Sequence, residues 1–262
     1  MRVEQLGEGE PDIAVVAAIH GDEPCGVHAV ERLLDERPPV RKPVKLVVAN
    51  EEALAQGVRY LDEDMNRAFP GDPDADTHEG RLAAELYAAV EDCLTFSIHS
   101  TRSHAEPFAV FDEMTEYVRE VIPRLPVATV VETGPSVDGR LFTSLDVVEV
   151  EAGLQGSDRA VENADRLTRA FLTATGVLPG DAPPKPIPHY RLREQIPKLE
   201  ADQYEVFVEN FAYVEPGTTF AAVDGEPQVA DEPFYPVLLS ADGYPTVFGY
   251  TADRIGELTA EA

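Results

Sequence analysis

The sequence predicts an α/β fold with a mainly parallel or mixed sheet flanked by helices, followed by a small C-terminal β domain. Apolar runs of strand length alternate with amphipathic segments of helix length over the first two-thirds of the chain. That alternation is typical of a parallel sheet with helical crossovers. Five prolines then fall between residues 179 and 188, and short strand-like pieces follow. We therefore expect an α/β domain over residues 1–178, and a Pro-rich linker with a small β domain over residues 179–262.

The individual elements follow from the spacing of apolar residues. We expect strands where apolar residues run together, over residues 12–19, 44–49, 93–99, 107–111, 127–131 and 146–150. We expect helices where they recur at helical spacing, over residues 24–36, 78–92, 113–123 and 157–175. Pro24 suits the start of the first helix, and Thr77 can cap the second. In the C-terminal part, residues 204–208 and 235–239 are the predicted strands.

The charge balance is strongly acidic, with 49 acidic against 21 basic residues and a formal net charge of -28. A nucleic-acid-binding protein needs a basic face, so this class of partner is excluded. Only four of the bases are lysine, and the acids are spread along the chain. Such a protein repels itself at low salt and is screened at high salt. The composition predicts a protein of a halophile, and the alternative is an ordinary acidic protein.

Neither a membrane nor a secreted location is indicated. No apolar run approaches the ~18–20 residues that cross a bilayer, and residues 1–8 lack the pattern of a signal peptide. We expect a cytoplasmic protein with no membrane partner. Cys25 and Cys93 form no spacing motif, and reduced thiols are expected in that compartment.

Three residues that can bind a metal follow two of the predicted strands. The tetrapeptide His20-Gly21-Asp22-Glu23 comes directly after the strand over 12–19, and His99 ends the strand over 93–99. The carboxyl ends of parallel strands meet at one edge of the sheet, where open α/β folds bind ligands. Two His and one Glu with a free fourth position are a catalytic zinc set. A lone His after a strand is more often a surface or core residue, so the prediction depends on their convergence.

Further polar residues fall on the same predicted edge. Glu151 lies just beyond the strand over 146–150, and the loop after the strand over 44–49 carries Arg59, Asn66 and Arg67. Glu149 and Glu151 are two residues apart and would share one face, so one of them can be structural. The edge would therefore combine carboxylates with guanidinium groups.

These motifs resemble, in order, those of the succinylglutamate desuccinylase/aspartoacylase family, within the zinc carboxypeptidase superfamily. The motifs are His20-Gly21-Asp22-Glu23, Arg59-Tyr60, Asp64-Met65-Asn66-Arg67, Ser97-Ile98-His99-Ser100 and Val150-Glu151-Ala152-Gly153-Leu154-Gln155. The resemblance covers residues 12–175 and implies a zinc-carboxypeptidase-like catalytic domain. With the composition, it points to a halophilic archaeon as the source. Two departures are Ser97, where many members have Asp, and Leu154, where the family has Pro.

The resemblance implies a role for each matched residue. His20, Glu23 and His99 would bind one Zn2+ per subunit. Glu151 would be the catalytic carboxylate that activates the zinc-bound water and protonates the leaving amine. Arg59 would polarise the scissile carbonyl, and Asn66 and Arg67 would hold the substrate's carboxylate. These roles suit the chemistry, because an amide is a poor electrophile and water a poor nucleophile at pH 7.

Two further residues are candidates for substrate binding. Arg102 follows His99 by three residues and can add positive charge to the pocket; the alternative is a surface arginine. Tyr235, in the small β domain, can reach over the site; the alternative is an aromatic residue of a sheet.

The sequence therefore predicts a zinc-dependent amidohydrolase, a deacylase that cleaves the amide bond of an N-acyl amino acid or a related small amide. One alternative is a metallocarboxypeptidase that acts on short peptides, and another is a non-catalytic metal- or small-ligand-binding protein. Cobalt or manganese can replace zinc in a His/Glu site. The expected partner is a small-molecule substrate, and the sequence is compatible with a homo-oligomer.

Overall fold

The computed structural model describes residues 1–134, 139–244 and 246–260. The strands are β1 Arg2–Leu6, β2 Ile13–Ala17, β3 Val44–Val48, β4 Leu94–Thr101, β5 Phe108–Phe111, β6 Thr129–Glu132, β7 Val147–Leu154, β8 Ile187–Pro197, β9 Tyr204–Val206, β10 Thr219–Val223, β11 Glu226–Val229, β12 Tyr235–Val237 and β13 Val247–Leu258. The helices are α1 Cys25–Glu36, α2 Glu51–Gln56, α3 His78–Val90, α4 Glu116–Val121 and α5 Asp158–Ala174, with short 3-10 turns between some of them.

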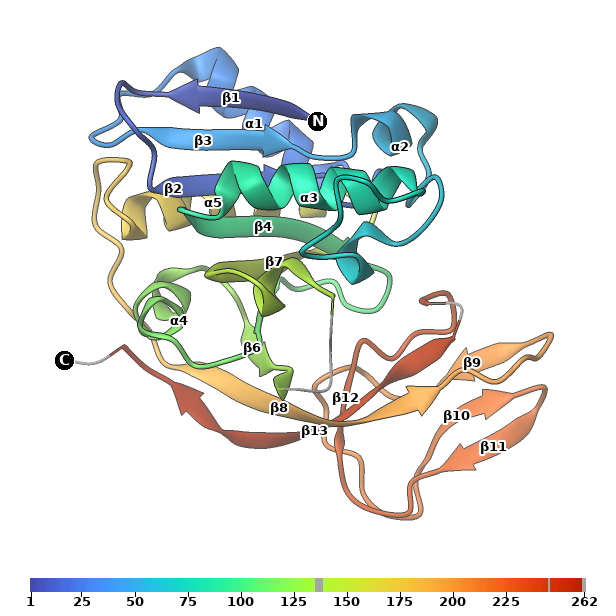
Figure 1. Ribbon diagram of the computed structural model, residues 1–262. Coiled ribbons are helices and arrows are strands. Elements are labelled where there is room, and N and C mark those ends of the chain that lie inside the picture. The colour runs from blue at the N-terminus through green and yellow to red at the C-terminus, as the bar shows by residue number, and fades with distance from the viewer. Residues whose placement is uncertain (135–138, 245, 261–262) are drawn as a thin grey trace.

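Among the described residues, ten strands form one mixed sheet in the order β1-β3-β2-β4-β7-β5-β6-β8-β13-β12 (Figure 1). The pairs β2/β3, β2/β4, β4/β7, β5/β6 and β6/β8 are parallel. The pairs β1/β3, β5/β7, β8/β13 and β12/β13 are antiparallel. This sheet with its flanking helices confirms the predicted fold class.

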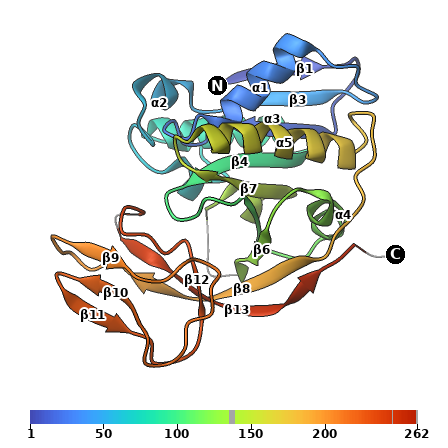
Figure 2. The same cartoon turned by 180° about the vertical axis from the view of Figure 1, so that it is seen from behind.

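Helices cover both faces of the parallel part of the sheet. α3 packs on one face, and α1 and α5 lie together on the other, as the views from front and back show (Figures 1 and 2). Strands β2 and β4 are buried along their whole length because both of their faces are covered. This explains why β2 reads as a continuous apolar run. None of the described helices is both long and apolar enough to cross a membrane.

In the first two-thirds of the chain, β1 and α2 are elements that the sequence did not predict. β1 is an edge strand with an exposed middle, so its sequence lacks an apolar run. α2 has six residues, too few to show a helical period; it begins where the side chain of Asn50 accepts a hydrogen bond from Ala53 N at 3.1 Å. The predicted cap is confirmed, since Thr77 Oγ accepts from Gly80 N at 3.2 Å.

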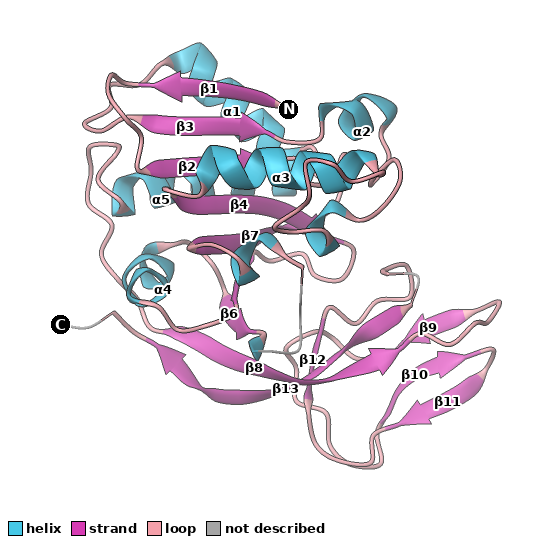
Figure 3. Ribbon diagram, viewed as in Figure 1, coloured by secondary structure: helices cyan, strands magenta, loops and turns pink. Residues whose placement is uncertain are grey.

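The C-terminal part is divided between two sheets (Figure 3). β8, β13 and β12 extend the ten-stranded sheet, and β9, β10 and β11 form a separate three-stranded sheet. Directly after the proline-rich stretch, β8 pairs in parallel with β6. The domain division at residue 178 stays a prediction, and the large sheet runs across that position.

Candidate functional site

The predicted metal ligands and Glu151 meet at the carboxyl end of the parallel strands. β2 ends at Ala17, and the turn that follows carries His20 and Glu23. His99 lies in β4 and Glu151 in β7, where the two residues are direct neighbours in the parallel register. All four side chains are buried. The sheet therefore places them on one rim, as expected for ligand sites in such folds.

The side chains of His20, Glu23 and His99 are arranged to share one cation. One ligand atom from each lies within 4.8 Å of the others. His20 Nδ1 is 2.9 Å from Glu23 Oε1, and His99 Nδ1 is 3.0 Å from Glu23 Oε2. His20 Nδ1 is buried and, apart from this close approach to Glu23, has no partner with hydrogen-bond geometry among the described residues. Two imidazoles and one carboxylate are the donor set of a catalytic zinc site, so these residues fit the metal.

In both histidines the second ring nitrogen, Nε2, has polar partners. His20 Nε2 lies 2.9 Å from Asp64 Oδ1. His99 Nε2 lies 3.1 Å from Ser97 Oγ and 3.5 Å from Glu149 Oε2. Metal-binding histidines usually hold their second N–H on a carboxylate or another acceptor, which fixes the ring orientation. Ser97 stands where many members of the resembled family have Asp. Its paired neighbour across β4 and β7 is Glu149, so the carboxylate near His99 Nε2 comes from Glu149.

The buried charges shift one another's pKa values. Burial disfavours the Glu23 carboxylate, but His20 and His99 outweigh it and hold its pKa well below the ordinary range. Burial also disfavours a charged His99, yet the carboxylates of Glu149, Glu23 and Glu151 raise its pKa to about 9. For Glu151, burial and the Glu23 charge raise the pKa to about 8. Its buried Oε2 has no hydrogen-bond partner within the part of the chain that the structure describes.

Gly21 allows the ligand turn to pack against α2. A Cβ at this position would lie 2.2 Å from the backbone carbon of Ala53, closer than any real contact. The backbone N–H of Gly21 donates to Arg59 O at 3.1 Å. The turn that carries His20 and Glu23 is thereby joined to the loop that carries Arg59.

The buried carboxylate of Glu79 holds the backbone of that loop by hydrogen bonds. Glu79, in α3, accepts from the backbone N–H groups of Leu61 at 2.7 Å and Asp62 at 3.0 Å, and from Asn50 Nδ2 at 3.0 Å. Burial opposes its charge, but these donors lower its pKa below the ordinary value. Glu79 thus fixes the chain between Arg59 and Asp64.

Arg59 lies against two of the predicted metal ligands, Glu23 and His20. Its Nη1 donates to Glu23 Oε1 at 2.9 Å, and its Nη2 donates to Asp64 Oδ2 at 3.1 Å and lies 2.9 Å from His20 Nε2. Burial alone would lower its pKa, but the carboxylates of Glu23 and Asp64 raise it above the ordinary value. The guanidinium is therefore a fixed positive charge beside the candidate metal site.

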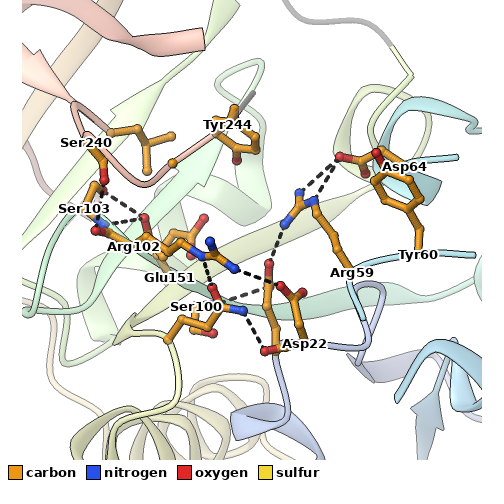
Figure 4. A pocket seen from close by; sticks show the side chains of 15 residues that line it. Asp22, Arg59, Tyr60, Asp64, Ser100, Arg102, Ser103, Glu151, Ser240 and Tyr244 are labelled. Atoms are coloured by element: carbon orange, nitrogen blue, oxygen red, sulfur yellow. Dashed lines mark hydrogen bonds and ion pairs between the residues drawn. The ribbon is translucent and has the colours of Figure 1, made fainter. Parts of the chain in front are cut away.

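A pocket of about 420 Å³ opens over this site (Figure 4). Its walls come from the turn after β2, the Arg59 loop, the end of β4, the end of β7 and a C-terminal loop. The lining residues are Asp22, Glu23, Arg59, Tyr60, Asp64, Ser100, Thr101, Arg102, Ser103, Glu151, Gln155, Leu238, Ser240, Gly243 and Tyr244. Polar groups of both signs therefore face the space above the metal ligands.

The predicted substrate-binding residues are not all in this pocket. Arg102 lines it, with Nε donating to Gln155 Oε1 at 2.8 Å. Asn66 is buried behind it, where its Oδ1 accepts from Leu141 N at 3.2 Å. Arg67 is exposed and lies 5.9 Å from the centre of the Tyr244 ring.

Tyr235 is not among the lining residues of the pocket. In β12, its ring packs 5.2 Å from Tyr190 and 5.4 Å from Tyr213. The structure places it in an aromatic cluster of the C-terminal part, the alternative given above.

Tyr244 and Arg140 are neighbours of the site that the sequence did not indicate. The Tyr244 ring lies 5.4 Å from the guanidinium carbon of Arg59. Burial raises the pKa of the Tyr244 hydroxyl, and the positive charge of Arg140 opposes this rise. Arg140 is 5% exposed; its Nη1 lies 3.7 Å from Glu149 Oε1, and its buried Nε has no hydrogen-bond partner among the described residues. Neither residue lies in a motif, so no sequence signal marked them; Asp64, by contrast, stands in the Asp64-Met65-Asn66-Arg67 motif.

Comparison with known proteins was made by sequence and by structure. Residues 9–115 match the sequence model of the succinylglutamate desuccinylase/aspartoacylase catalytic domain. This range includes both histidines that are predicted to bind the metal, but it ends before Glu151. A succinylglutamate desuccinylase from Pseudomonas paraeruginosa is 30% identical over 133 residues, which is 44% of this chain and 40% of that protein. The matched part thus spans well under half of this curated relative.

Solved structures share the fold over nearly the whole chain. A protein described as succinylglutamate desuccinylase/aspartoacylase from Rhodobacter sphaeroides superposes with a TM-score of 0.77 at 18% identity, covering 96% of this chain and 89% of that one. Murine aminoacylase 3 superposes with a TM-score of 0.73 at 21% identity, covering 97% and 98%. At these identities the likeness establishes the fold. Residues 9–115 are thus similar in sequence to the succinylglutamate desuccinylase/aspartoacylase catalytic domain, and the chain shares the fold of solved structures described by that name.

Proposed function

We propose that this protein is a zinc-dependent hydrolase that cleaves the amide bond of an N-acyl amino acid or a related small amide. The observation that carries the proposal is the buried group of His20, Glu23 and His99, with Glu151 beside it on the neighbouring strand and a pocket above. The names of the relatives, desuccinylase and aminoacylase, agree with this reaction class.

His20, Glu23 and His99 would hold the metal through the atoms that face one another. The buried Nδ1 of His20 supports this assignment, because it faces Glu23 Oε1 without hydrogen-bond geometry, and a buried polar atom left without a hydrogen bond is costly unless a ligand meets it. When bound, zinc would supply a water of lowered pKa and polarise the substrate carbonyl. Within the described ranges, one group of His, Cys, Asp or Glu side chains could hold a metal ion, which supports one zinc per subunit.

Glu151 is the proposed general base. Its carboxylate would take a proton from the attacking water and return it to the leaving amine. A pKa of about 8 lies near neutral pH, where a carboxyl group can both accept and return a proton. Its unpartnered Oε2 leaves a free acceptor for the water.

Arg59 is proposed to stabilise the negative charge that develops on the carbonyl oxygen. Its contacts with Glu23 and Asp64 keep the guanidinium charged and in place before the substrate arrives. Charge that is already oriented needs little reorganisation during the reaction, which is why such groups lower barriers.

The substrate's carboxylate is proposed to bind where arginines surround Tyr244. Arg59 and Arg67 flank its ring, and the buried Arg140 lacks a partner at Nε. Arg140 Nη1 lies 3.7 Å from Glu149 Oε1, but a buried N–H donor left without a hydrogen bond is costly, so an incoming anion that accepts from Nε would be favoured there. Asn66 would contribute by holding Leu141 N and Glu149 in place. Arg102 remains a candidate for a second polar group of the substrate.

The test is release of free amine from a substrate panel at multimolar salt. N-acetylaspartate, N-succinylglutamate and dipeptides would be compared, each with and without a chelator. We expect chelator-sensitive hydrolysis of at least one N-acyl amino acid. His20→Ala should abolish it, whereas His28→Ala, an exposed histidine of α1, should not.

Two results would contradict the proposal. If only the dipeptides were hydrolysed, the protein would be a metallocarboxypeptidase. If zinc bound but no amide was hydrolysed, the non-catalytic alternative would hold.

A further inference from the structure

One wall of the pocket comes from the C-terminal part of the chain. Leu238, Ser240, Gly243 and Tyr244 line it, and we call residues 238–244 the C-terminal loop. The metal ligands lie far away in the sequence, on β4 and the turn after β2. The position of Tyr244 beside Arg59 therefore depends on the hydrogen bonds between this loop and the end of β4.

Asn210 makes that connection through both ends of its amide. Its Nδ2 donates to Ser103 O at 2.8 Å and to Leu239 O at 3.0 Å, and its Oδ1 accepts from Leu239 N at 2.8 Å. Ser103 follows β4, the strand of His99, and Leu239 belongs to the C-terminal loop. Asn210 is 8% exposed, so water offers these groups little competition.

The next residue, Phe211, anchors Asn210 through the packing of its ring. Phe211 has a φ of 66°, a conformation that is costly for a residue with a side chain. Its ring packs 5.3 Å from Phe108 and 5.0 Å from His104, beside β5. The turn that presents the Asn210 amide is thus anchored to the large sheet.

Ser240 and Arg102 add a second connection between the same segments. Ser240 Oγ donates to Arg102 O at 3.2 Å, and Arg102 Nη1 donates to Asp242 O at 3.3 Å. Ser240 is as buried as Asn210, at 8%, but the Arg102 side chain is 53% exposed. This connection is the weaker of the two, because it has two hydrogen bonds of 3.2 and 3.3 Å, one of them from an exposed arginine, against three shorter ones at Asn210.

We propose that Asn210 is a positioning residue that holds the C-terminal loop, and with it Tyr244, over the pocket. The role of Tyr244 in substrate binding rests on the proposed function, but the position of the loop does not. Asparagine suits this task because it offers two donors and an acceptor at once. Aspartate has the same shape but would face the carbonyls of Ser103 and Leu239 with no donor.

A unique fluorophore tests the position of the loop. The chain contains no tryptophan, so Tyr244→Trp introduces a single one in the wall of the pocket. In this background, Asn210→Asp should raise the acrylamide quenching constant and red-shift the emission. Thr251→Val, which removes side-chain hydrogen bonds to Glu194 between β13 and β8, is the matched control and should change neither. Unchanged quenching in Asn210→Asp would overturn the proposal.

Two additions keep the test decisive. If Asn210→Asp does not fold, Asn210→Ala, which removes the same three hydrogen bonds without adding a charge, should give a shift of the same sign; no shift would overturn the proposal. In the otherwise native protein, Asn210→Asp should lower kcat/KM on the order of 10- to 100-fold through a misplaced pocket wall. This loss should shrink in a Tyr244→Ala background, and full additivity would contradict action through Tyr244. Absence of hydrolysis in the native protein would refute the proposed function, while the quenching result would still decide the role of Asn210.

Discussion

The carboxylate of Asp64 joins His20 to Arg59. Its Oδ1 lies 2.9 Å from His20 Nε2, and its Oδ2 accepts from Arg59 Nη2 at 3.1 Å. Burial opposes the Asp64 charge, but His20 and Arg59 outweigh it and lower its pKa below the ordinary range. One side chain therefore orients a proposed metal ligand and the proposed oxyanion-stabilising group.

Asp64→Asn should weaken zinc binding by about 10- to 100-fold, the usual cost of losing the outer partner of a histidine ligand. It should also lower kcat, because the guanidinium of Arg59 loses a fixed contact. Competition with a chelating dye measures the first effect and steady-state kinetics the second. Asp74→Asn, an exposed acid of the same region, is the control. Unchanged zinc affinity in Asp64→Asn would show that this contact does not orient His20.

Zinc binding should release a proton at neutral pH. The neighbouring carboxylates raise the pKa of His99 to about 9 in the metal-free protein, so His99 is protonated at pH 7. A metal needs the neutral imidazole, so zinc affinity should rise about tenfold per pH unit below pH 9 and then level off. Calorimetry in buffers of different ionisation enthalpy measures the released proton. An enthalpy independent of the buffer would contradict this pKa.

Glu79→Gln should destabilise the protein by about 1–3 kcal/mol, because a buried acceptor of backbone N–H groups is replaced by an amide. The folded-state pKa of Glu79 lies below its ordinary value of 4.5. Its contribution to stability is therefore present above pH 4.5 and is lost as the pH falls through the folded-state pKa. Urea unfolding at pH 7 and at lower pH measures both effects. A difference between wild type and variant that does not shrink at low pH would contradict the assignment.

Salt should stabilise the fold. With a formal net charge of -28, the folded chain repels itself, and 1 M salt shortens the Debye length to about 3 Å. We expect Tm to rise between 0.1 and 1 M KCl. A flat or falling Tm would show that the acidic surface carries no such penalty. The halophilic archaeal origin stays a prediction in either case.

The sequence predicted those strands and helices whose burial produces a recognisable local pattern of apolar residues. β2, β4 and β7 lie inside the sheet, so their apolar runs were visible, and the motifs at their ends placed His20, His99 and Glu151. β8 and β13 were not predicted as part of the large sheet. Their outer halves are exposed and carry charged residues, so neither reads as an apolar run.

The pocket wall could not be predicted for a different reason. Tyr244 reaches Arg59 because Asn210 and Ser240 hold the C-terminal loop beside the end of β4, and no spacing in the sequence encodes a contact over such a separation. Tyr235 was the sequence candidate for this region, but its neighbours Tyr190 and Tyr213 belong to an aromatic cluster outside the pocket lining.

A zinc titration tests the central claim most directly. Metal-free protein would receive increasing zinc while amine release from the best N-acyl amino acid is followed, for wild type and for Glu151→Gln. We expect wild-type activity to rise to a break at one equivalent of zinc. The variant should bind the same equivalent and lose about 10²- to 10⁴-fold in kcat, the usual contribution of a general base. Full activity without zinc, or wild-type turnover by Glu151→Gln, would contradict the proposed site.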